Sequence, residues 1–396
     1  MTYKAYKYRI YPNKEQQELI NKHIGCCRYV YNLCLEKKIN AYKTSKKSIS
    51  SFELIKLLPS LKKEQETSFL KEVNSLSLQA AIRNLDSAYQ RFFKEKKGFP
   101  KFKSKRNARQ SFQIVQNTTV DFDEKKVYIP KFKKGIKCRF HRFFDGNIKT
   151  STITRTSTGR YYISILVELD EDKPEKKPID ESKAVGIDLG IKTFATLSNG
   201  EEIPNPKNLR NAIAKLKRLQ RSLSKKAKDS NNREKERHIL ACQYERVTNR
   251  RNDFLEKVTH QLVTRYDTIC LETLSTRNMM KNHHLAQYLS DIAIGKFNEL
   301  IEEKAEWYGA NILRIGRFEP SSKTCSCGYV YKDLKLSQRV WTCPNCGRRN
   351  QRDSLAANNI KAFAFNKRNN TAGTAEINAC GDMNLKEVQP KKLTSI

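Results

Sequence analysis

Asp188 has the surroundings in this sequence that most clearly indicate chemistry. It lies in an apolar run, with Ala184 to Ile187 before it and Leu189 and Ile191 after it. A carboxylate in such surroundings must be paired, protonated or bound to a metal ion, because burying an isolated charge is unfavourable. A turn or capping aspartate beside Gly190 is the purely structural alternative. Asp188 is therefore a candidate metal ligand.

Glu272 and Asp353 extend this candidate site. Glu272 follows a second buried strand, Thr268 to Leu271, at the carboxyl edge where open α/β sheets bind ligands. Asp353 lies in QRDSLAANNIKAF, which is typical of a helix start, so a plain N-cap is its alternative role. Three carboxylates together form a hard-oxygen site suited to Mg²⁺ or Mn²⁺. Two such ions about 4 Å apart can support phosphodiester cleavage.

A nucleotide-binding site is the competing interpretation of GIDLG, which also opens the phosphate loop of actin-like and sugar-kinase ATPases. Such an ATPase needs a second glycine-rich phosphate loop, and we find none in the sequence. The charge also favours a polynucleotide partner, since 77 Lys and Arg against 42 Asp and Glu give a net charge of +35. A ribosome-associated or generally basic protein is the alternative.

Four of the eleven cysteines lie in one short window, Cys325, Cys327, Cys343 and Cys346. Two close pairs on facing hairpin tips can hold Zn²⁺ in a tetrahedral thiolate site. Four thiolates leave no open coordination position, so this zinc would be structural. The first pair is one residue shorter than C-x-x-C, which predicts a weaker hold on the metal. A ribbon that folds without metal is the alternative.

The elements that must position these residues follow from the periodicity of the chain. Alternation predicts a strand at Tyr3 to Tyr11, and Asn13 can cap the helix after it. A second helix is predicted at Val73 to Lys94, and mainly strands from Phe99 to Leu169. The first half is thus a β module with a helical insertion. Residues 170–182, rich in proline and charge, have the composition of a linker.

The second half alternates strands and helices, which predicts a mixed α/β sheet. The predicted elements are strands at AVGIDLG and TFATLSNG, a polar helical stretch from Lys207 to Arg265, a strand at YDTICLETL, a helix from Asp291 to Trp307 and a strand at Asn311 to Ile315. Asp188 and Glu272 therefore belong to buried strands of this half. The sequence after Lys367 has little apolar periodicity, which is typical of a disordered tail.

Basic and aromatic residues supply candidates for nucleic-acid binding. Basic side chains interleaved with phenylalanines suit backbone contacts and base stacking. A solvated loop or helix face without a partner is the alternative. The candidates are Lys101, Lys103, Lys105, Arg106, Arg109, Tyr3, Tyr8, Lys217 and Arg221.

The sequence contains no apolar run of about 18 residues, and its start lacks the apolar core of a signal peptide. We therefore expect no membrane partner and a place in the cytosol. Eleven cysteines in such a chain argue for metal binding and core packing rather than for disulfides.

Several long phrases make the chain resemble the TnpB family, the RNA-guided nucleases of bacterial insertion sequences and ancestral relatives of type V CRISPR effectors. The phrases occur in the expected order and span almost the whole chain. They include YKYRIYPNKEQ, LQAAIRNLDSAYQRFF, GFPKFKSKRNARQSF, VGIDLGIKTFATLSNG, ICLETLSTRNMMKNHHLA, WTCPNCG and QRDSLAANNI. The family's catalytic carboxylates correspond to Asp188, Glu272 and Asp353.

The resemblance implies a multidomain α+β and α/β fold. Residues 1–169 would form a wedge-like β module with a helical recognition insertion at about 13–97, joined by a linker at 170–182. Residues 183–366 would form an RNase H-like (RuvC) nuclease domain with a zinc ribbon at about 320–350, and 367–396 a disordered tail. The implied partners are a guide RNA derived from the transposon end and double-stranded target DNA next to a short transposon-adjacent motif. The resemblance also implies a monomer in the bacterial cytosol, associated with the nucleoid.

Two departures from the family pattern affect these expectations. The short Cys325–Cys327 pair weakens the ribbon, and Leu355 replaces an asparagine near the acidic site, which implies slower cleavage. A guided DNA-binding repressor without cleavage is an alternative, although the intact carboxylates argue against it. A strand-transfer transposase, which shares this sheet and acidic triad, is the other alternative.

Overall fold

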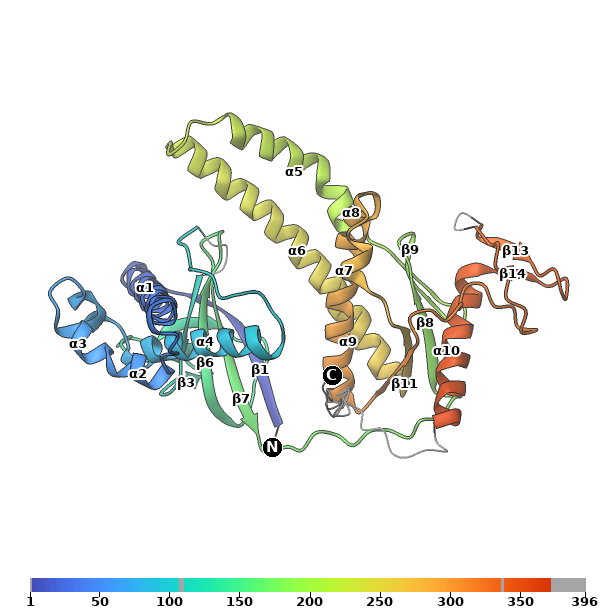
Figure 1. The fold of residues 1–396 in the computed structure, drawn as a ribbon, viewed down its shortest axis with the longest axis horizontal. Coiled ribbons are helices and arrows are strands. Elements are labelled where there is room, and N and C mark those ends of the chain that lie inside the picture. The colour runs from blue at the N-terminus through green and yellow to red at the C-terminus, as the bar shows by residue number, and fades with distance from the viewer. Residues whose placement is uncertain (1, 107–109, 336–337, 372–396) are drawn as a thin grey trace, which may run out of the picture. The chain divides into compact units, whose positions relative to one another are not determined.

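The computed structural model describes residues 2–106, 110–335 and 338–371 of the chain (Figure 1). Its internal contacts divide the chain into two compact units. The first comprises residues 1–173 and 213–248, and the second comprises residues 174–212 and 249–396. Each unit is built on its own sheet.

The first unit is built on a seven-stranded antiparallel sheet of strand order β2-β6-β7-β1-β5-β4-β3. Its strands are β1 (Thr2–Tyr11), β2 (Gln110–Ile114), β3 (Thr119–Asp121), β4 (Lys126–Tyr128), β5 (Ile136–Arg139), β6 (Asn147–Arg155) and β7 (Tyr161–Leu169). Alternate residues of β1, namely Tyr6, Tyr8 and Ile10, are buried. The predicted strand over Tyr3 to Tyr11 is confirmed.

Four α-helices and one 3₁₀ helix lie between β1 and β2 in the described part of the chain. They are α1 (Lys14–Ser45), α2 (Ser51–Lys56), α3 (Leu58–Lys63), the 3₁₀ helix η1 (Ser68–Glu72) and α4 (Ser75–Lys94). Asn13 caps α1 as predicted, because its side chain accepts from the Gln16 backbone N–H while the Gln16 side chain accepts from the Asn13 N–H. The helical insertion in a β module is therefore present.

The second unit contains a five-stranded mixed sheet of order β10-β9-β8-β11-β12. Its strands are β8 (Ala184–Leu189), β9 (Thr193–Leu197), β10 (Glu202–Pro204), β11 (Thr268–Glu272) and β12 (Asn311–Ile315). β8, β11 and β12 are parallel, whereas β9 and β10 add to the β8 edge in antiparallel fashion. The mixed α/β sheet predicted for this half is confirmed.

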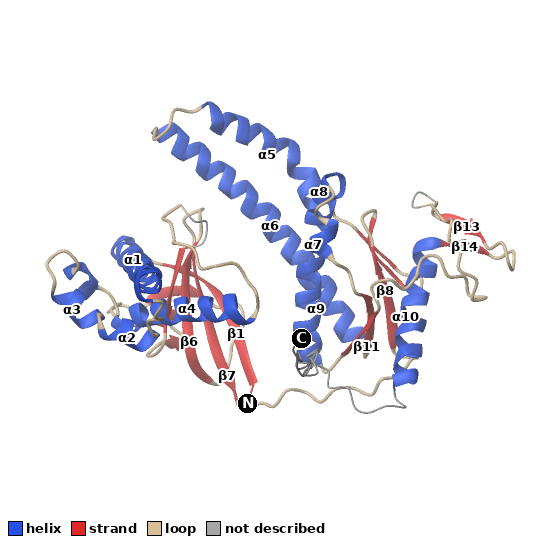
Figure 2. Ribbon diagram, viewed as in Figure 1, coloured by secondary structure: helices blue, strands red, loops and turns tan. Residues whose placement is uncertain are grey.

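Different helices cover the two faces of this sheet (Figure 2). The helices after β10 in the chain are α5 (Asn208–Lys225), which lies mostly in the first unit, α6 (Asn231–Arg265), which is divided between the two units, α7 (Thr276–Met279), α8 (His283–Ile292), α9 (Ile294–Tyr308) and α10 (Arg352–Thr371). On one face, Val185 and Ile187 of β8 pack with α6 and α9. On the other face, Ala184 of β8 and Cys270 of β11 pack with α10.

Three predicted boundaries in this half differ from the structure. The polar stretch from Lys207 to Arg265 is two helices, α5 and α6, which are separated by residues 226–230. The helix predicted at Asp291 to Trp307 is interrupted at Ala293, which has a left-handed backbone with φ of 53°. Helix α10 continues to Thr371, beyond the expected end of the folded domain at 366. The rest of the predicted tail, 372–396, lies outside the described residues.

A small two-stranded ribbon, β13 (Val340–Thr342) and β14 (Arg349–Gln351), precedes α10.

Helix α10 packs closely against β8 at Gly186. A Cβ atom at this position would lie 2.1 Å from the backbone oxygen of Ala357 and 2.9 Å from Cβ of Lys361. Only glycine therefore permits this approach of helix to strand.

In the described part of the chain, no helix has the length and apolar character needed to cross a membrane.

Candidate active site and metal centre

Asp188 and Glu272 come together because of strand alternation and register. Successive side chains of a strand point to opposite faces, so these two point to the face that α10 covers. The parallel register of β8 and β11 pairs Ile187 with Leu271. The next residue of each strand, Asp188 and Glu272, therefore lies at the same carboxyl edge of the sheet.

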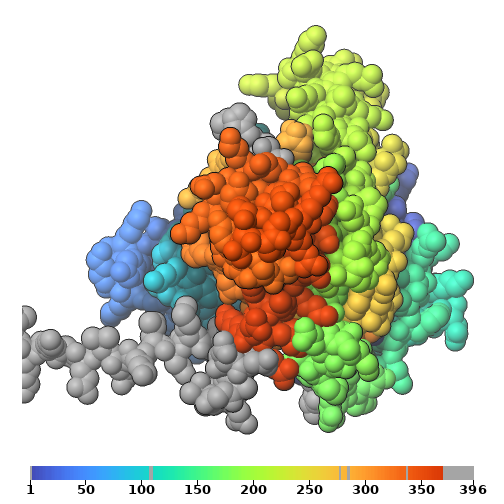
Figure 3. Space-filling model, turned by 90° about the vertical axis from the view of Figure 1, so that its right-hand side faces the viewer, coloured from blue at the N-terminus to red at the C-terminus, as the bar shows by residue number. Residues whose placement is uncertain are grey.

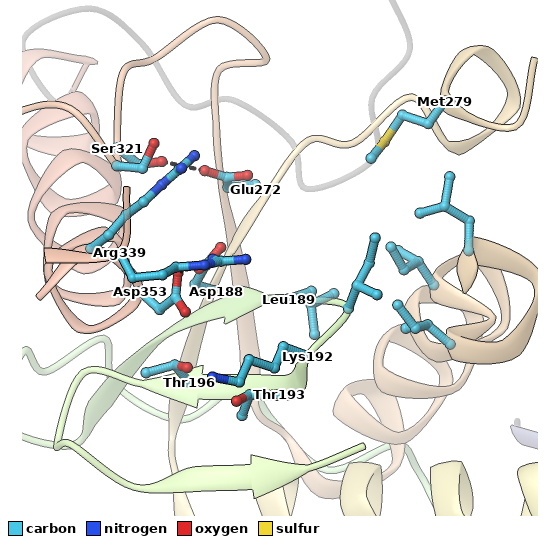
Figure 4. Close-up of a pocket in the computed structure, with 17 residues that line it drawn as sticks. Asp188, Leu189, Lys192, Thr193, Thr196, Glu272, Met279, Ser321, Arg339 and Asp353 are labelled. Carbon is cyan, nitrogen blue, oxygen red and sulfur yellow. Dashed lines mark hydrogen bonds and ion pairs between the residues drawn. The ribbon is translucent and has the colours of Figure 1, made fainter. Parts of the chain in front are cut away.

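Helix α10 brings the third carboxylate to this edge. Asp353 is in its first turn, and the backbone N–H of Arg352 donates to the carbonyl of Arg339 at 2.8 Å. Asp188, Glu272 and Asp353 line one cavity of about 280 Å³ (Figure 4). The structure thus brings together three acidic residues, of which the first and the last are 165 positions apart in the sequence.

The electrostatics of this cavity favour a bound cation. The pKa of Asp188 is raised to about 7, first by burial and then by the negative charges of Glu272 and Asp353, against the lowering effect of Arg352 and Arg339. A divalent cation would relieve this repulsion and suits carboxylate oxygen ligands. The chemistry of these oxygen donors therefore suits a divalent metal ion, although among the described residues only the four ribbon cysteines have ligand atoms within 4.8 Å of one another.

Arg339 is a residue of the candidate site that the sequence analysis missed. It immediately precedes β13 and lines the carboxylate cavity. Its guanidinium forms an ion pair with Asp353 at 2.9 Å, and about half of its side chain is exposed. Figure 4 shows it extending among the three carboxylates. Nothing in the local sequence distinguishes Arg339 from the other arginines of the ribbon, since its role depends on how the ribbon is placed.

Ser321 is a second residue that the sequence analysis missed. Its hydroxyl donates a hydrogen bond to the carboxylate of Glu272 (Figure 4). Ser321 is buried, and it lies in the segment between β12 and the first cysteine of the ribbon. The hydrogen bond therefore fixes the orientation of Glu272 at the cavity.

The four cysteines predicted to bind zinc come together in one cluster. Their sulfur atoms lie within 4.8 Å of one another. The Sγ atoms are 3.7 Å apart both in the Cys325–Cys346 pair and in the Cys327–Cys343 pair. A tetrahedral site with Zn–S bonds of about 2.3 Å places its sulfurs about 3.8 Å apart. The short Cys325–Cys327 pair is therefore compatible with zinc geometry.

Hydrogen bonds prepare the first cysteine pair for ionisation. Burial opposes ionisation of Cys325, but donors including the Cys327 backbone N–H and the Asn350 amide lower its pKa to about 6. The pKa of Cys327 is lowered as well, by the backbone N–H of Tyr329 and by the amide of Asn345. Thiolates are the zinc-binding form of cysteine. The ribbon that carries these cysteines belongs, with α10, to the orange and red surface that faces the viewer in Figure 3.

The first unit has a cationic sheet face whose basic residues the sequence analysis did not name. Arg9 lies directly opposite Arg139, and Tyr11 lies opposite Lys137, so these side chains share one face. The ammonium of Lys7 lies 4.9 Å from the Tyr162 ring centroid on the same face. Like charges directly opposite each other destabilise a sheet. A polyanion on this face would relieve that repulsion.

The predicted nucleic-acid contacts have different outcomes on the first unit. The prediction for Tyr8 is wrong, because its side chain is fully buried and its hydroxyl donates to the carbonyl of Arg142. Tyr3 is half exposed, with its hydroxyl donating to Glu168 at 2.7 Å. The ammonium of Lys103 lies 4.0 Å from the ring centroid of Tyr31.

Apart from Tyr8, all the candidates, Tyr3 and Lys103 included, remain predictions. The remaining ones that the structure describes have exposed side chains. They are Lys101, Lys105 and Arg106 in the segment after α4, and Lys217 and Arg221 on α5. Arg109 lies outside the described residues.

Comparison with known proteins places the chain in a family. A family model described as "Probable transposase" matches residues 164–283, one described as "Helix-turn-helix domain" matches residues 1–47, and one described as "Cas12f1-like, TNB domain" matches residues 295–360. Among the described residues of the 1–47 match, the structure has β1 followed by one long helix, α1.

Similar proteins match nearly the whole chain. A Streptomyces pristinaespiralis protein named "Putative RNA-guided DNA endonuclease" is 37% identical over 382 residues, which cover 96% of this chain and 91% of that protein. "Putative RNA-guided DNA endonuclease InsQ" of Escherichia coli (strain K12) is 29% identical over 394 residues, which cover 96% of this chain and 94% of that protein.

A solved structure is similar in fold. The match, at 16% identity and a TM-score of 0.54, is to a chain in the cryo-EM structure of a Cas12f1–sgRNA–target DNA complex, and it covers 88% of this chain and 83% of that chain. The fold is thus that of a multidomain α+β protein similar to Cas12 effectors, with a TNB domain. The chain belongs to the TnpB family.

We predict one zinc ion per chain, held by the four ribbon cysteines. Cys343→Ser should remove this zinc, because it takes away one of the four thiolates. Cys138→Ser, which changes a buried thiol in the first unit, is the matched control and should retain it. Elemental analysis of the purified proteins gives the measurement. Zinc near zero in freshly purified wild type would show that the ribbon folds without metal.

The raised pKa of Asp188 predicts a pH-dependent stability of the metal-free protein. The native carboxyl holds its proton up to about pH 7, whereas the reference value is 3.8. Wild-type stability therefore falls as pH rises between these values, and the full penalty is present above pH 7.

The neutral variant Asp188→Asn lacks this penalty. It should be more stable than wild type by about 1–3 kcal/mol at pH 8, and the difference should shrink toward zero near pH 4. Thermal unfolding in buffer without divalent cations measures this, with Asp333→Asn, an exposed carboxyl, as the control. A difference that is the same at both pH values would contradict the assigned repulsion.

Proposed function

We propose that this protein is an RNA-guided, metal-dependent DNA endonuclease whose second unit is an RNase H-like (RuvC) nuclease domain. The meeting of Asp188, Glu272 and Asp353 in one cavity carries this proposal. The mixed sheet, with its acidic residues at the carboxyl edge of β8 and β11, supports it. So do relatives that are named RNA-guided DNA endonucleases and match the chain almost end to end.

The three carboxylates would hold Mg²⁺, or Mn²⁺, through their oxygen atoms. When bound, a pair of such ions supplies an activated water and stabilises the leaving oxygen of a phosphodiester. The protein's own contribution is to fix the carboxylates: Asp188 and Glu272 stand on rigid strands, and Asp353 on the first turn of α10. The guided repressor without cleavage is disfavoured because all three carboxylates are present.

Arg339 would act on the substrate rather than on the metal. Its guanidinium is paired with Asp353 in the metal-free site. Were Asp353 to hold a cation, this pairing would weaken, and the Arg339 guanidinium could donate to the non-bridging oxygens of a phosphate, a role for which its planar fork is suited. The ribbon would thus contribute a side chain to the active site.

The cationic face of the first unit would bind the phosphates of the guide RNA. Lys7, Arg9, Lys137 and Arg139 supply the charge, and Tyr11 and Tyr162 supply rings on the same face. The origin of the guide at the transposon end, the short adjacent DNA motif and the monomeric state belong to the same proposal. So do the wedge-like role of the first unit and a cytosolic, nucleoid-associated location.

Removal of a carboxylate should abolish cleavage without weakening guided binding. We expect Asp188→Ala and Glu272→Gln to reduce DNA cleavage below detection, whereas guide-dependent binding stays within about twofold, because these residues hold metal rather than phosphate. Sequencing the RNA that copurifies with the protein identifies the guide, and cleavage and binding are then measured with matched target DNA. A variant that cuts at the wild-type rate would refute the assignment.

The cationic face predicts a specific change in the salt dependence of RNA binding. Lys137→Gln combined with Arg139→Gln should weaken guide binding and reduce the slope of log affinity against log salt by about 2, since two phosphate contacts are lost. Lys47→Gln combined with Lys63→Gln removes the same charge from exposed positions elsewhere in this unit. Equal effects of the two double variants would show that only net charge matters.

A further inference from the structure

Asn359 makes a buried connection that the chemistry described so far does not use. It lies on α10, and its side chain is 8% exposed. Its amide nitrogen donates to the carbonyl oxygens of Ser321 at 2.7 Å and Thr324 at 2.6 Å. An asparagine amide carries two N–H donors, so both are used. The segment from Ser321 to Thr324 is therefore tied to the helix by one side chain.

Ser321 carries this connection into the active site. Its backbone is held by Asn359, and its hydroxyl donates to the carboxylate of Glu272. A serine hydroxyl has a single O–H, which this contact uses. Partners of this kind orient a metal-ligating carboxylate and raise its affinity for the ion. The orientation of Glu272 thus depends on the position of the Ser321 backbone.

Asn359 also links the start of the zinc ribbon to α10, the helix that carries Asp353. Thr324, whose carbonyl accepts from Asn359, is followed directly by Cys325 of the zinc cluster. Asn359 and Asp353 belong to one helix, α10. Any shift of α10 relative to the ribbon start would therefore move the hydroxyl that holds Glu272.

We propose that Asn359 is a positioning residue that couples α10 and the ribbon to Glu272 through Ser321. It sets the metal affinity of the carboxylate site without touching metal or substrate. The proposal rests on the proposed function insofar as the three carboxylates are the metal site. It is carried by two hydrogen bonds from one buried amide and one from the Ser321 hydroxyl.

The test uses the full-length protein and Mn²⁺ as the probe. We expect Asn359→Ala and Ser321→Ala each to weaken Mn²⁺ binding at the carboxylate site by about 10-fold, as loss of a partner behind a metal ligand does. The Mg²⁺ concentration needed for half-maximal cleavage should rise by the same factor. Asn358→Ala is the matched control, because this neighbouring side chain is exposed and donates within α10, to the carbonyl of Ser354.

The double variant separates positioning from general destabilisation. Ser321→Ala and Asn359→Ala act through one chain of contacts, so their combination should weaken Mn²⁺ binding no more than about twofold beyond either single variant. Independent losses that multiply to about 100-fold would overturn the proposal, as would wild-type Mn²⁺ affinity in both single variants. If Asn359→Ala does not fold, Asn359→Ser, which keeps a polar group but cannot make both donations, takes its place, and wild-type Mn²⁺ affinity in the folded variant overturns the proposal.

Mn²⁺ binding is measured by electron paramagnetic resonance without guide RNA or DNA. Failure of the proposed nuclease function would appear as a wild-type protein that binds Mn²⁺ but does not cleave guided DNA. Failure of the positioning proposal would appear as unchanged Mn²⁺ affinity in the variants. The two failures are therefore distinguishable.

Discussion

The contact between β8 and α10 is the constraint on which the acidic site depends. Gly186 lets the helix backbone approach so closely that a single added Cβ would lie 2.1 Å from the Ala357 oxygen. Two residues further along β8 stands Asp188, and four residues before Ala357 stands Asp353. Because packed interiors transmit displacement, a shift at this contact would separate the two carboxylates. The distance between Asp188 and Asp353 is therefore set by this helix–strand contact.

Helix α10 also packs against the ribbon, so that one helix contacts both the acidic site and the ribbon. Leu355 packs against the buried ribbon cluster that contains Trp341 and Cys343. By the family pattern, this leucine replaces an asparagine near the acidic site. The structure gives it another contact, in which an apolar side chain joins the ribbon to the start of α10. Arg339 and Ser321 lie on either side of Cys325 in the chain and contact Asp353 and Glu272.

Electrostatic character differs between the two units. The second unit concentrates negative charge in a cavity, where each carboxylate raises the pKa of Asp188. The first unit presents cations on an open sheet face, with Arg9 directly opposite Arg139. Neither arrangement is favourable by itself, since like charges repel in both. Each is relieved by an oppositely charged partner, a divalent cation in the cavity and a phosphate backbone on the sheet face.

The sequence by itself determined the parts whose signal is local. Buried strands ending in acids, a helix capped at Asn13 and four cysteines at ribbon spacing are visible in the chain because period, capping and spacing are properties of neighbouring residues. What only the tertiary structure decided is which distant residues meet. The face on which Tyr8 is buried, the role of Arg339 and the connection from Asn359 through Ser321 to Glu272 depend on strand order and helix docking. Those arise from packing between segments far apart in sequence, which no local pattern records.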